Sequence, residues 1–543
     1  MAHDRFVNRH LGPRDQEIQE MLEFIGVSSV DELISQTVPE NIRLKEPLKL
    51  KEGLTERQYY REILRLASKN KVFNTYIGMG YYDTITPAVI LRNVLENPAW
   101  YTSYTPYQAE ISQGRLEALL NYQTMVCELT GMEIANASLL DEATAAGEAM
   151  IMMMNLRSRQ MVKNNVNVLL VDEKMWPQTH DVLITRAQPL GVELRILPKD
   201  KFEFTRDVFG AMVQYPNSDG EITDYKKLVE QAHEKEVKVA VATDLLSLAI
   251  LVPPGEWGAD IVFGNSQRFG VPMGYGGPHA AFFAARDEFK RSMPGRIIGI
   301  TKDIHGNRAL RMALQTREQH IKREKATSNI CTAQALLANM AGFFGVYHGP
   351  EGIKTIATRI HSIAAFLSAE IEKLGYKQLN KNYFDTIRIE LPKHVKREDI
   401  EWLSLELEMN FRYFENGEVG ISIDETTNTE DMGWILEVFA KAANKQYQVV
   451  QEYPSDAAIS PEFARTSEFM QQEVFNSYRS ETEMVRYIKK LELKDISLTH
   501  SMIPLGSCTM KLNAAAEMLP LSWIEFSAFT RLFRKTRRVV TTK

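Results

Sequence analysis

Short β-rich runs that alternate with longer polar segments constrain the fold of this chain more than any other feature. The runs are rich in Val, Leu and Ile and occupy residues 166–172, 192–198, 237–244 and 260–264. The segments between them have a polar composition that is compatible with helices. This alternation is typical of a mostly parallel sheet that is covered by helices on both faces. We therefore predict an α/β fold with one large domain of this kind.

The pattern changes in the last part of this region. A helix-like stretch at 360–375 is followed by a strand-like run at 385–391, a helical piece, another β-rich stretch at 409–423 and a final helix to about Lys445. This order predicts a smaller α+β domain. At the other end, the first seventy residues predict a helical extension, in which Ile18, Met21, Leu22 and Ile25 share one helical face and Gly26 ends the helix.

Length and charge exclude some classes of protein. With 543 residues the chain is too long for a single core, and two or three domains are expected. The net charge of −6 argues against nucleic-acid binding and against a membrane surface, and no apolar run has membrane-spanning length. The N-terminal residues include acids and lack the apolar region of a secretory signal.

The three cysteines lie far apart, at Cys127, Cys331 and Cys508, so they predict neither a disulfide framework nor a metal site. A reducing cytoplasm is the expected location. The final thirteen residues contain six basic side chains and no acid, which indicates a solvated tail, with anion binding as the alternative.

The distance between Asp244 and the triplet Ser266–Gln267–Arg268 resembles that between two working residues in one class of pyridoxal-phosphate (PLP) enzyme. There, an Asp at a strand end keeps the pyridinium nitrogen protonated, and a later Lys forms a Schiff base with the cofactor. Gln267, near the corresponding position, is an amide, and Arg268 is permanently protonated, so neither can form the Schiff base. The sequence predicts a PLP-enzyme scaffold that lacks its covalent anchor and has no catalytic residue of its own.

The candidate residues of this degenerate cofactor pocket are Asp141, Thr144, His180, Asp244, Ser266 and Gln267. Asp141 and Glu142 stand at the start of a helix, where a carboxylate would repel a phosphate, and Asp141 is expected to cap that helix. Asp244 is interpreted as a strand-end residue bonded to a loop, although it could pair with a pyridinium. His180 lies where a ring-stacking His might be sought, but an ordinary structural role is favoured.

Several long strings carry a resemblance to one family. They begin at Arg9 (RHLGPRDQEIQEML), Thr37 (TVPENIRLKEPL), Tyr76 (YIGMGYYDTITPAVILRNVLENPAWYTSYTPYQ), Ser266 (SQRFGVPMGYGGPHAAFFA) and Arg323 (REKATSNICTAQAL). The chain resembles the P-protein family of the glycine cleavage system from about residue 5 to about residue 526. The resemblance implies a fold-type-I PLP enzyme that is built twice, with a degenerate N-terminal half and a C-terminal half that carries the Schiff-base Lys.

On this resemblance the chain has five parts. They are a helical extension (1–70), a PLP-transferase-like large domain without its Lys (71–355), a small α+β domain (356–447), an incomplete start of the second, catalytic half (448–526) and a basic tail unlike the family (527–543). The cofactor, PLP, would be bound through the missing C-terminal half.

A polar aromatic loop is a further candidate, through Tyr104, Thr105, Tyr107, Gln108 and Ser112. Such loops suit a half-buried site where rings pack and hydroxyls donate hydrogen bonds. By resemblance this loop approaches the active site of the partner half. A direct contribution to that site and plain interface packing both remain open, as they do for the glycine-bearing loop at 78–87.

The activity that the resemblance implies is that of glycine decarboxylase, or glycine dehydrogenase (aminomethyl-transferring). Glycine is decarboxylated with PLP, and its aminomethyl group passes to the lipoyl arm of the H protein. The implied partners are glycine, lipoylated H protein, a C-terminal half or subunit, the T protein and dihydrolipoamide dehydrogenase, in an oligomer. This chain is expected to be inactive alone. The alternatives are a non-catalytic subunit that completes a separate C-terminal half, and a truncated product without function whose residues after 448 lack a sheet to pack on.

Overall fold

The computed structural model describes residues 6–10, 12–103, 105–328, 333–447, 451–501, 513–530 and 532. The chain divides into two compact units. One comprises the described residues within Met1–Lys71 and Leu512–Glu525, and the other those within Val72–Lys511 and Phe526–Lys535. The candidate site lies entirely in the second unit. Cys331 and Cys508 are outside the described residues.

A seven-stranded sheet forms the centre of the second unit. Its strands are β2 (Ile134–Ala135), β3 (Val168–Asp172), β4 (Glu193–Leu197), β5 (Val208–Tyr215), β6 (Lys238–Asp244), β7 (Ile261–Asn265) and β8 (Ala281–Ala285), in the order β2-β8-β7-β6-β5-β3-β4. The neighbours from β7 to β4 pair in parallel, and β8 runs antiparallel to both β7 and β2. This confirms the mostly parallel sheet that the sequence predicts.

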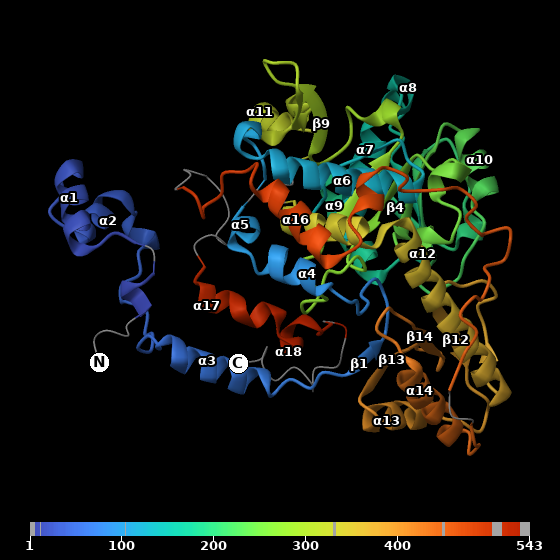
Figure 1. Ribbon diagram of the computed structural model, residues 1–543. Helices are drawn as coiled ribbons and strands as arrows, with labels where there is room; N and C mark the ends of the chain where they lie inside the picture. Colours follow the sequence, from blue (N-terminus) through green and yellow to red (C-terminus); the bar gives the residue numbers. More distant parts are fainter. Residues whose placement is uncertain are drawn as a thin grey trace. The chain divides into compact units, whose positions relative to one another are not determined.

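Helices cover both faces of this sheet (Figure 1). Side chains that alternate along a strand belong to two different buried clusters, one on each face. In β3, Leu169 and Val171 belong to one buried cluster, with α7 (Glu142–Asn155) and α9 (Pro177–Leu190). Val168 and Leu170 belong to the other, with α6 (Gln113–Thr130) and α12 (Ala335–Lys373). Successive strand residues point to opposite faces, so a strand that is covered on both sides is apolar throughout.

The sequence pattern does not predict two strands of this sheet, β5 and β8. All eight residues of β5 are buried, so no alternation of polar and apolar side chains marks it. A glycine in the middle of a strand, such as Gly210, usually weakens the strand. Close packing explains Gly210, because an added Cβ would lie 3.0 Å from side-chain atoms of Leu169 and Met153. The sequence predicts a helix-compatible segment between β4 and β6. This segment instead contains the central strand β5.

The small domain contains a second sheet. Its strands are β1 (Asn74–Tyr76), β11 (Lys377–Gln378), β12 (Thr386–Glu390), β13 (Met409–Tyr413) and β14 (Val419–Ser422), in the order β1-β13-β14-β12-β11, with α13 (Arg397–Glu406) and α14 (Thr429–Ala442) beside it. Two features cross the predicted domain boundaries. The edge strand β1 comes from residues assigned to the large domain, and α12 continues through position 355 after a kink at Gly349, where φ is 63°.

Residues 451–501 pack on helices of the first half. The guanidinium of Arg465 donates hydrogen bonds of 2.8 Å to the carbonyls of Glu128, Leu129 and Leu248. In α15 (Val474–Ser477) and α16 (Glu481–Glu492), five buried side chains join the main core, Phe475, Met484, Tyr487, Ile488 and Leu491. Residues after 448 are expected to lack a sheet to pack on, and this stretch packs instead on helices of the first half.

The first unit is helical, as predicted, with α1 (Asp15–Ile25), α2 (Val30–Thr37), α3 (Glu56–Ala67) and α17 (Ala515–Met518). Gly26 ends α1 in the left-handed conformation, and the Ser29 side chain caps α2. The predicted apolar face of α1 is only partly covered, because Leu22 is buried but Met21 and Ile25 are exposed.

The remaining elements are short helices and one hairpin. They are α4 (Ala88–Ile90), α5 (Pro98–Tyr101), α8 (Arg159–Lys163), α10 (Lys226–His233), α11 (Gln319–Lys322), α18 (Ile524–Ser527) and the antiparallel pair β9 (Ile297–Lys302) and β10 (Arg308–Ala313). Within the described ranges, no helix combines the length and apolar character needed to cross a bilayer.

Candidate functional site

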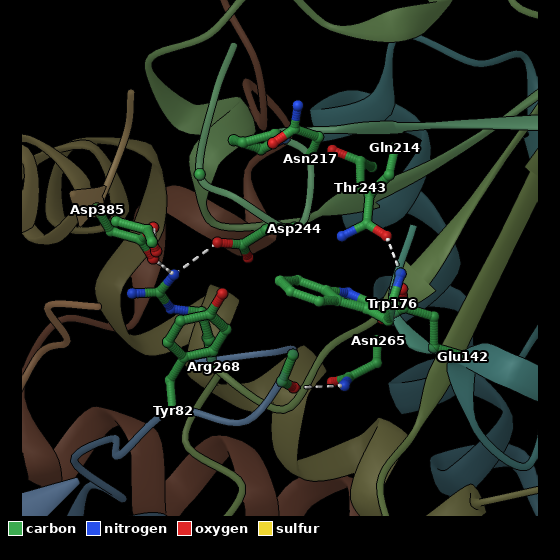
Figure 2. Close-up of a pocket in the computed structure, with 14 residues that line it drawn as sticks. Tyr82, Glu142, Trp176, Gln214, Asn217, Thr243, Asp244, Asn265, Arg268 and Asp385 are labelled. Carbon is green, nitrogen blue, oxygen red and sulfur yellow. Dashed lines mark hydrogen bonds and ion pairs between the residues drawn. The ribbon is translucent and has the colours of Figure 1, made fainter. Parts of the chain in front are cut away.

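A small pocket lies at the carboxyl ends of the parallel strands, where α/β sheets bind their ligands. Gln214 comes from the end of β5, Asp244 from the last position of β6 and Asn265 from the last position of β7. The start of α7 contributes Glu142, and the small domain contributes Asp385. The site is therefore assembled from the regions of both sheets in the second unit (Figure 2).

The guanidinium of Arg268 lines this pocket between Asp244 and Asp385 (Figure 2). It donates to Asp244 Oδ2 at 2.6 Å, to Asp385 Oδ2 at 2.5 Å and to the carbonyl of Ile423 at 3.1 Å. The ring of Tyr82 lies beside it, 3.9 Å from the guanidinium carbon to the ring centroid (Figure 2). Asp244 thus pairs with a permanent cation supplied by the chain itself.

Burial strongly influences the charges of this cluster. It disfavours the charged form of Arg268, but the carboxylates of Asp244 and Asp385 outweigh that effect and raise the pKa of Arg268. Burial also raises the pKa of the Asp385 carboxyl, against the opposing effect of Arg268. One guanidinium shared by two carboxylates links the large domain to the small one.

Gln267 and Ser266 point away from the pocket. The amide of Gln267 accepts from the Tyr82 N–H at 3.1 Å and donates to the Tyr82 and Val271 carbonyls at 2.7 and 2.8 Å. Ser266 Oγ donates to the Ala280 carbonyl at 2.8 Å. The residues of the predicted triplet therefore have different roles. Gln267 holds the 78–87 loop, and Arg268 is the one member of the triplet that lines the pocket.

The start of α7 is capped as predicted, since Asp141 accepts from the Thr144 N–H at 2.7 Å. The pocket is lined here by Glu142 and by neither of those two residues. Burial raises the pKa of Glu142 to about 8, with further contributions from the charges of Asp244 and Asp141. An acidic side chain stands where a helix N-terminus would otherwise attract a phosphate.

His180 does not line the pocket. Its Nε2 lies 2.9 Å from the carbonyl of Asp172, which is the ordinary structural role that was favoured. The aromatic rings that line the pocket belong to Tyr82 and Trp176, and the backbone N–H of Trp176 donates to Gln214 Oε1 at 2.9 Å (Figure 2). Trp176 stands in the same sequence motif as His180, so its ring was a signal available in the sequence. Asp385 gave no such signal, because it is 117 positions from Arg268 along the chain.

The polar aromatic loop lies outside the lining of this pocket. The structure describes four of its five candidates, Thr105, Tyr107, Gln108 and Ser112, and Tyr104 is outside the described residues. The Tyr107 hydroxyl accepts from Arg296 at 2.5 Å, and Ser112 Oγ accepts from Arg115 at 2.8 Å. Thr105 is buried and Gln108 is exposed.

The residues of the pocket do not fit PLP. No lysine lines it, and its cavity volume of about 30 Å³ is room for about two water molecules. Asp244, the candidate partner of a pyridinium, is already paired with Arg268, and the side chain of Glu142 occupies the helix start where a phosphate would bind. The arrangement is an ionic cluster that offers no lysine to the cofactor aldehyde. Nor do the described residues include a group of three or more His, Cys, Asp and Glu side chains that could hold a metal ion.

Known structures share this fold. A crystal structure of glycine decarboxylase (P-protein) of the glycine cleavage system, in inhibitor-bound form, superposes with a TM-score of 0.72 at 32% identity, over 80% of this chain and 99% of that one. Sphingosine-1-phosphate lyase from Burkholderia pseudomallei, at 12% identity and a TM-score of 0.54, shares the fold alone. The architecture is that of the fold-type-I PLP enzymes, as predicted.

Sequence comparison is more specific. "Glycine dehydrogenase (decarboxylating)" from Bacteroides thetaiotaomicron is 61% identical over 97% of this chain, and the protein of that name from Nostoc punctiforme is 54% identical over 96%. The chain spans about half the length of these curated relatives, 55% and 53%. The sequence pattern described as "Glycine cleavage system P-protein" matches residues 8–439. The chain therefore belongs to the P-protein family of the glycine cleavage system.

Proposed function

We propose that this chain supplies the N-terminal half of a glycine decarboxylase and leaves cofactor binding to a second half. The observation that carries this proposal is the small pocket without a lysine, in which the guanidinium of Arg268 already pairs with Asp244 and Asp385. A fold-type-I scaffold whose cofactor position is closed by its own side chain has no place for PLP. The chain alone is therefore inactive.

The complete enzyme, on this proposal, decarboxylates glycine with PLP held by the C-terminal half and passes the aminomethyl group to the lipoyl arm of the H protein. When bound there, PLP supplies the electron sink for loss of CO2. The T protein and dihydrolipoamide dehydrogenase act in the same system, which we place in the cytoplasm.

This chain contributes shape and contacts to the enzyme. The aromatic loop is the candidate that reaches the partner's active site, since the side chains of Tyr107 and Gln108 are exposed on it. The hydroxyl of Tyr107 is held by Arg296, which orients the loop.

A second candidate is a non-catalytic subunit that completes a separately encoded C-terminal chain. The solved P-protein supports this candidate. The match covers 99% of that chain but only 80% of this one, so that P-protein chain is shorter than this chain. A truncated product without function is less well supported, because residues 451–501 have a well-packed place on α6 and α12.

Reconstitution tests the proposal. The chain is purified alone and together with a co-expressed C-terminal half from the Bacteroides relative, and glycine-dependent CO2 exchange is measured with lipoylated H protein. We expect exchange only with both halves, and no Schiff-base absorbance that borohydride can reduce in this chain with added PLP. A covalent PLP adduct on this chain, or turnover by it unaided, would overturn the proposal.

A further inference from the structure

The N-terminal arm, defined as residues 6–54, exposes an unusual amount of apolar surface. Six of its most exposed large apolar side chains are Val7, Phe24, Ile42, Leu44, Leu48 and Leu50. Phe24 is 94% exposed and Leu50 81%. Of the arm's described residues, only Leu22 and Val27 are buried. Apolar side chains at this density on one short segment indicate a surface that packs against something outside its own compact unit.

The helices of the arm need such a partner. α1 has eleven residues and α2 has eight, and helices of this length are marginal in water unless an apolar face is packed. Both are well capped and amphipathic, so the sequence favours these helices, yet α2 has no buried residue. The side of α1 that should be buried contains Met21 and Ile25, which are half exposed.

The start of the second half already lies in the same unit as the arm. On α3, which follows the arm directly, the Tyr60 ring meets Trp523 edge-on with ring centroids 5.7 Å apart. Asn70 Nδ2 donates to the carbonyl of Glu525 at 2.8 Å. These C-terminal residues belong to the stretch that resembles the opening of the catalytic half. Nearly half the length of the Bacteroides relative lies outside the match, which leaves enough protein to cover the arm.

We infer that the N-terminal arm is a docking surface for the second half of the P protein. Its apolar side chains pack on an apolar face of that half and extend the interface that residues 513–525 begin on α3. The inference rests on the proposed function, since it assigns that function's partner to a surface. A second copy of this chain is the competing occupant, and the continuity with α3 favours the second half.

A pair of matched double variants tests the inference. In the full chain, Phe24→Asp with Leu50→Asp alters the arm, and Ile304→Asp with Trp402→Asp alters two other exposed apolar positions. The probe is the C-terminal part of the Bacteroides relative, whose folding is verified by its own Schiff-base absorbance. We expect the arm variant to bind this probe at least tenfold more weakly than the wild-type chain. The control variant should bind within about twofold of the wild type.

The outcomes separate the two proposals. Failure of the wild-type chain to bind the folded probe overturns the proposed function itself. Equal binding by the wild-type chain and the arm variant, or equal weakening in both variants, overturns only the arm's role. Light scattering completes the test, because an arm variant that loses self-association but still binds the probe identifies a second copy as the occupant and also overturns the inference.

Discussion

Arg268 provides one permanent cation for two largely buried carboxylates. In a PLP enzyme the acid at the strand end faces a cationic ring nitrogen. Here Asp244 faces the guanidinium of Arg268, and the same guanidinium holds Asp385 of the small domain. The two carboxylates are largely buried, so they need a cation that remains charged at every physiological pH.

Replacing Arg268 with methionine should therefore destabilise the chain strongly. Arg268→Met leaves Asp244 and Asp385 as a buried pair of like charges, and removal of one partner of a buried ion pair typically costs about 3–5 kcal/mol. Denaturant unfolding monitored by circular dichroism measures the loss. Addition of Asp244→Asn and Asp385→Asn to this variant should restore much of the stability, because the uncompensated charges are gone. A loss below about 1 kcal/mol for Arg268→Met contradicts the account.

The sequence predicts the chemistry of this site better than its geometry. That no residue of the triplet could form a Schiff base follows from residue type alone. Which of Gln267 and Arg268 points into the pocket depends on the backbone after β7, and Asp385 is brought in by tertiary folding. The capping role of Asp141 was predictable, because it depends only on a local hydrogen bond.

At the scale of elements, the docking of α16 on α6 shows how residues after 448 become part of the first half. Asp495 accepts from the N–H groups of Gly114 and Arg115 at 2.7 and 3.2 Å and from Arg115 Nε at 2.8 Å. It thereby satisfies the free N-terminus of α6, whose own Ser112 provides no side-chain cap. This cap comes from a distance of 380 positions, so local sequence could not predict it.

Gly114→Ala should separate these two helices. An added Cβ would lie 1.9 Å from the carbonyl oxygen of Leu491, a backbone atom that cannot turn aside. Alanine favours an isolated helix by about 1 kcal/mol, but overpacking of this kind costs about 1–3 kcal/mol or more. We expect a lower denaturant midpoint and faster hydrogen exchange in 481–492.

The matched control is Gly433→Ala in α14, where nothing lies within 4 Å of the added Cβ. There the helix propensity acts alone, and stability should stay the same or rise by up to about 1 kcal/mol. If both substitutions stabilise the chain equally, α16 does not pack on α6 as the structure has it.

The elements that the sequence predicts correctly are those with a local signal. The strands that became β3, β4, β6 and β7 lie within two residues of their predicted bounds. β1 is only three residues long and exists through its pairing with β13, whose partner residues lie more than 300 positions away. Such strands cannot be predicted from propensity or periodicity, because the pairing itself creates them.

At the scale of the whole molecule, buried acids control how stability depends on pH. Burial raises the pKa of Glu142 to about 8 and that of Asp83 to about 7, where the charge of Asp424 also contributes. Such an acid binds more protons in the folded state than in the unfolded chain, so the free energy of unfolding falls as pH rises. For Glu142 this loss of stability begins near pH 4.5, the ordinary pKa of a glutamate, and continues through about pH 8. His348 has the opposite effect on the free energy of unfolding, but only between about pH 4 and pH 6.5, because burial lowers its pKa from 6.5 to about 4.

Glu142→Gln should therefore flatten the pH dependence of stability. Glutamine has nearly the same shape and carries no charge, so it should gain about 1–3 kcal/mol over the wild type near pH 8.5, and much less near pH 5. Urea unfolding at both pH values measures the difference, and comparison with the wild type cancels the histidine contribution. The control is Glu234→Gln, which removes an exposed carboxylate and should change stability by less than about 0.5 kcal/mol at either pH. An equal effect of Glu142→Gln at both pH values would mean that Glu142 is already charged when folded, and the pocket would then be open to water rather than closed around Arg268.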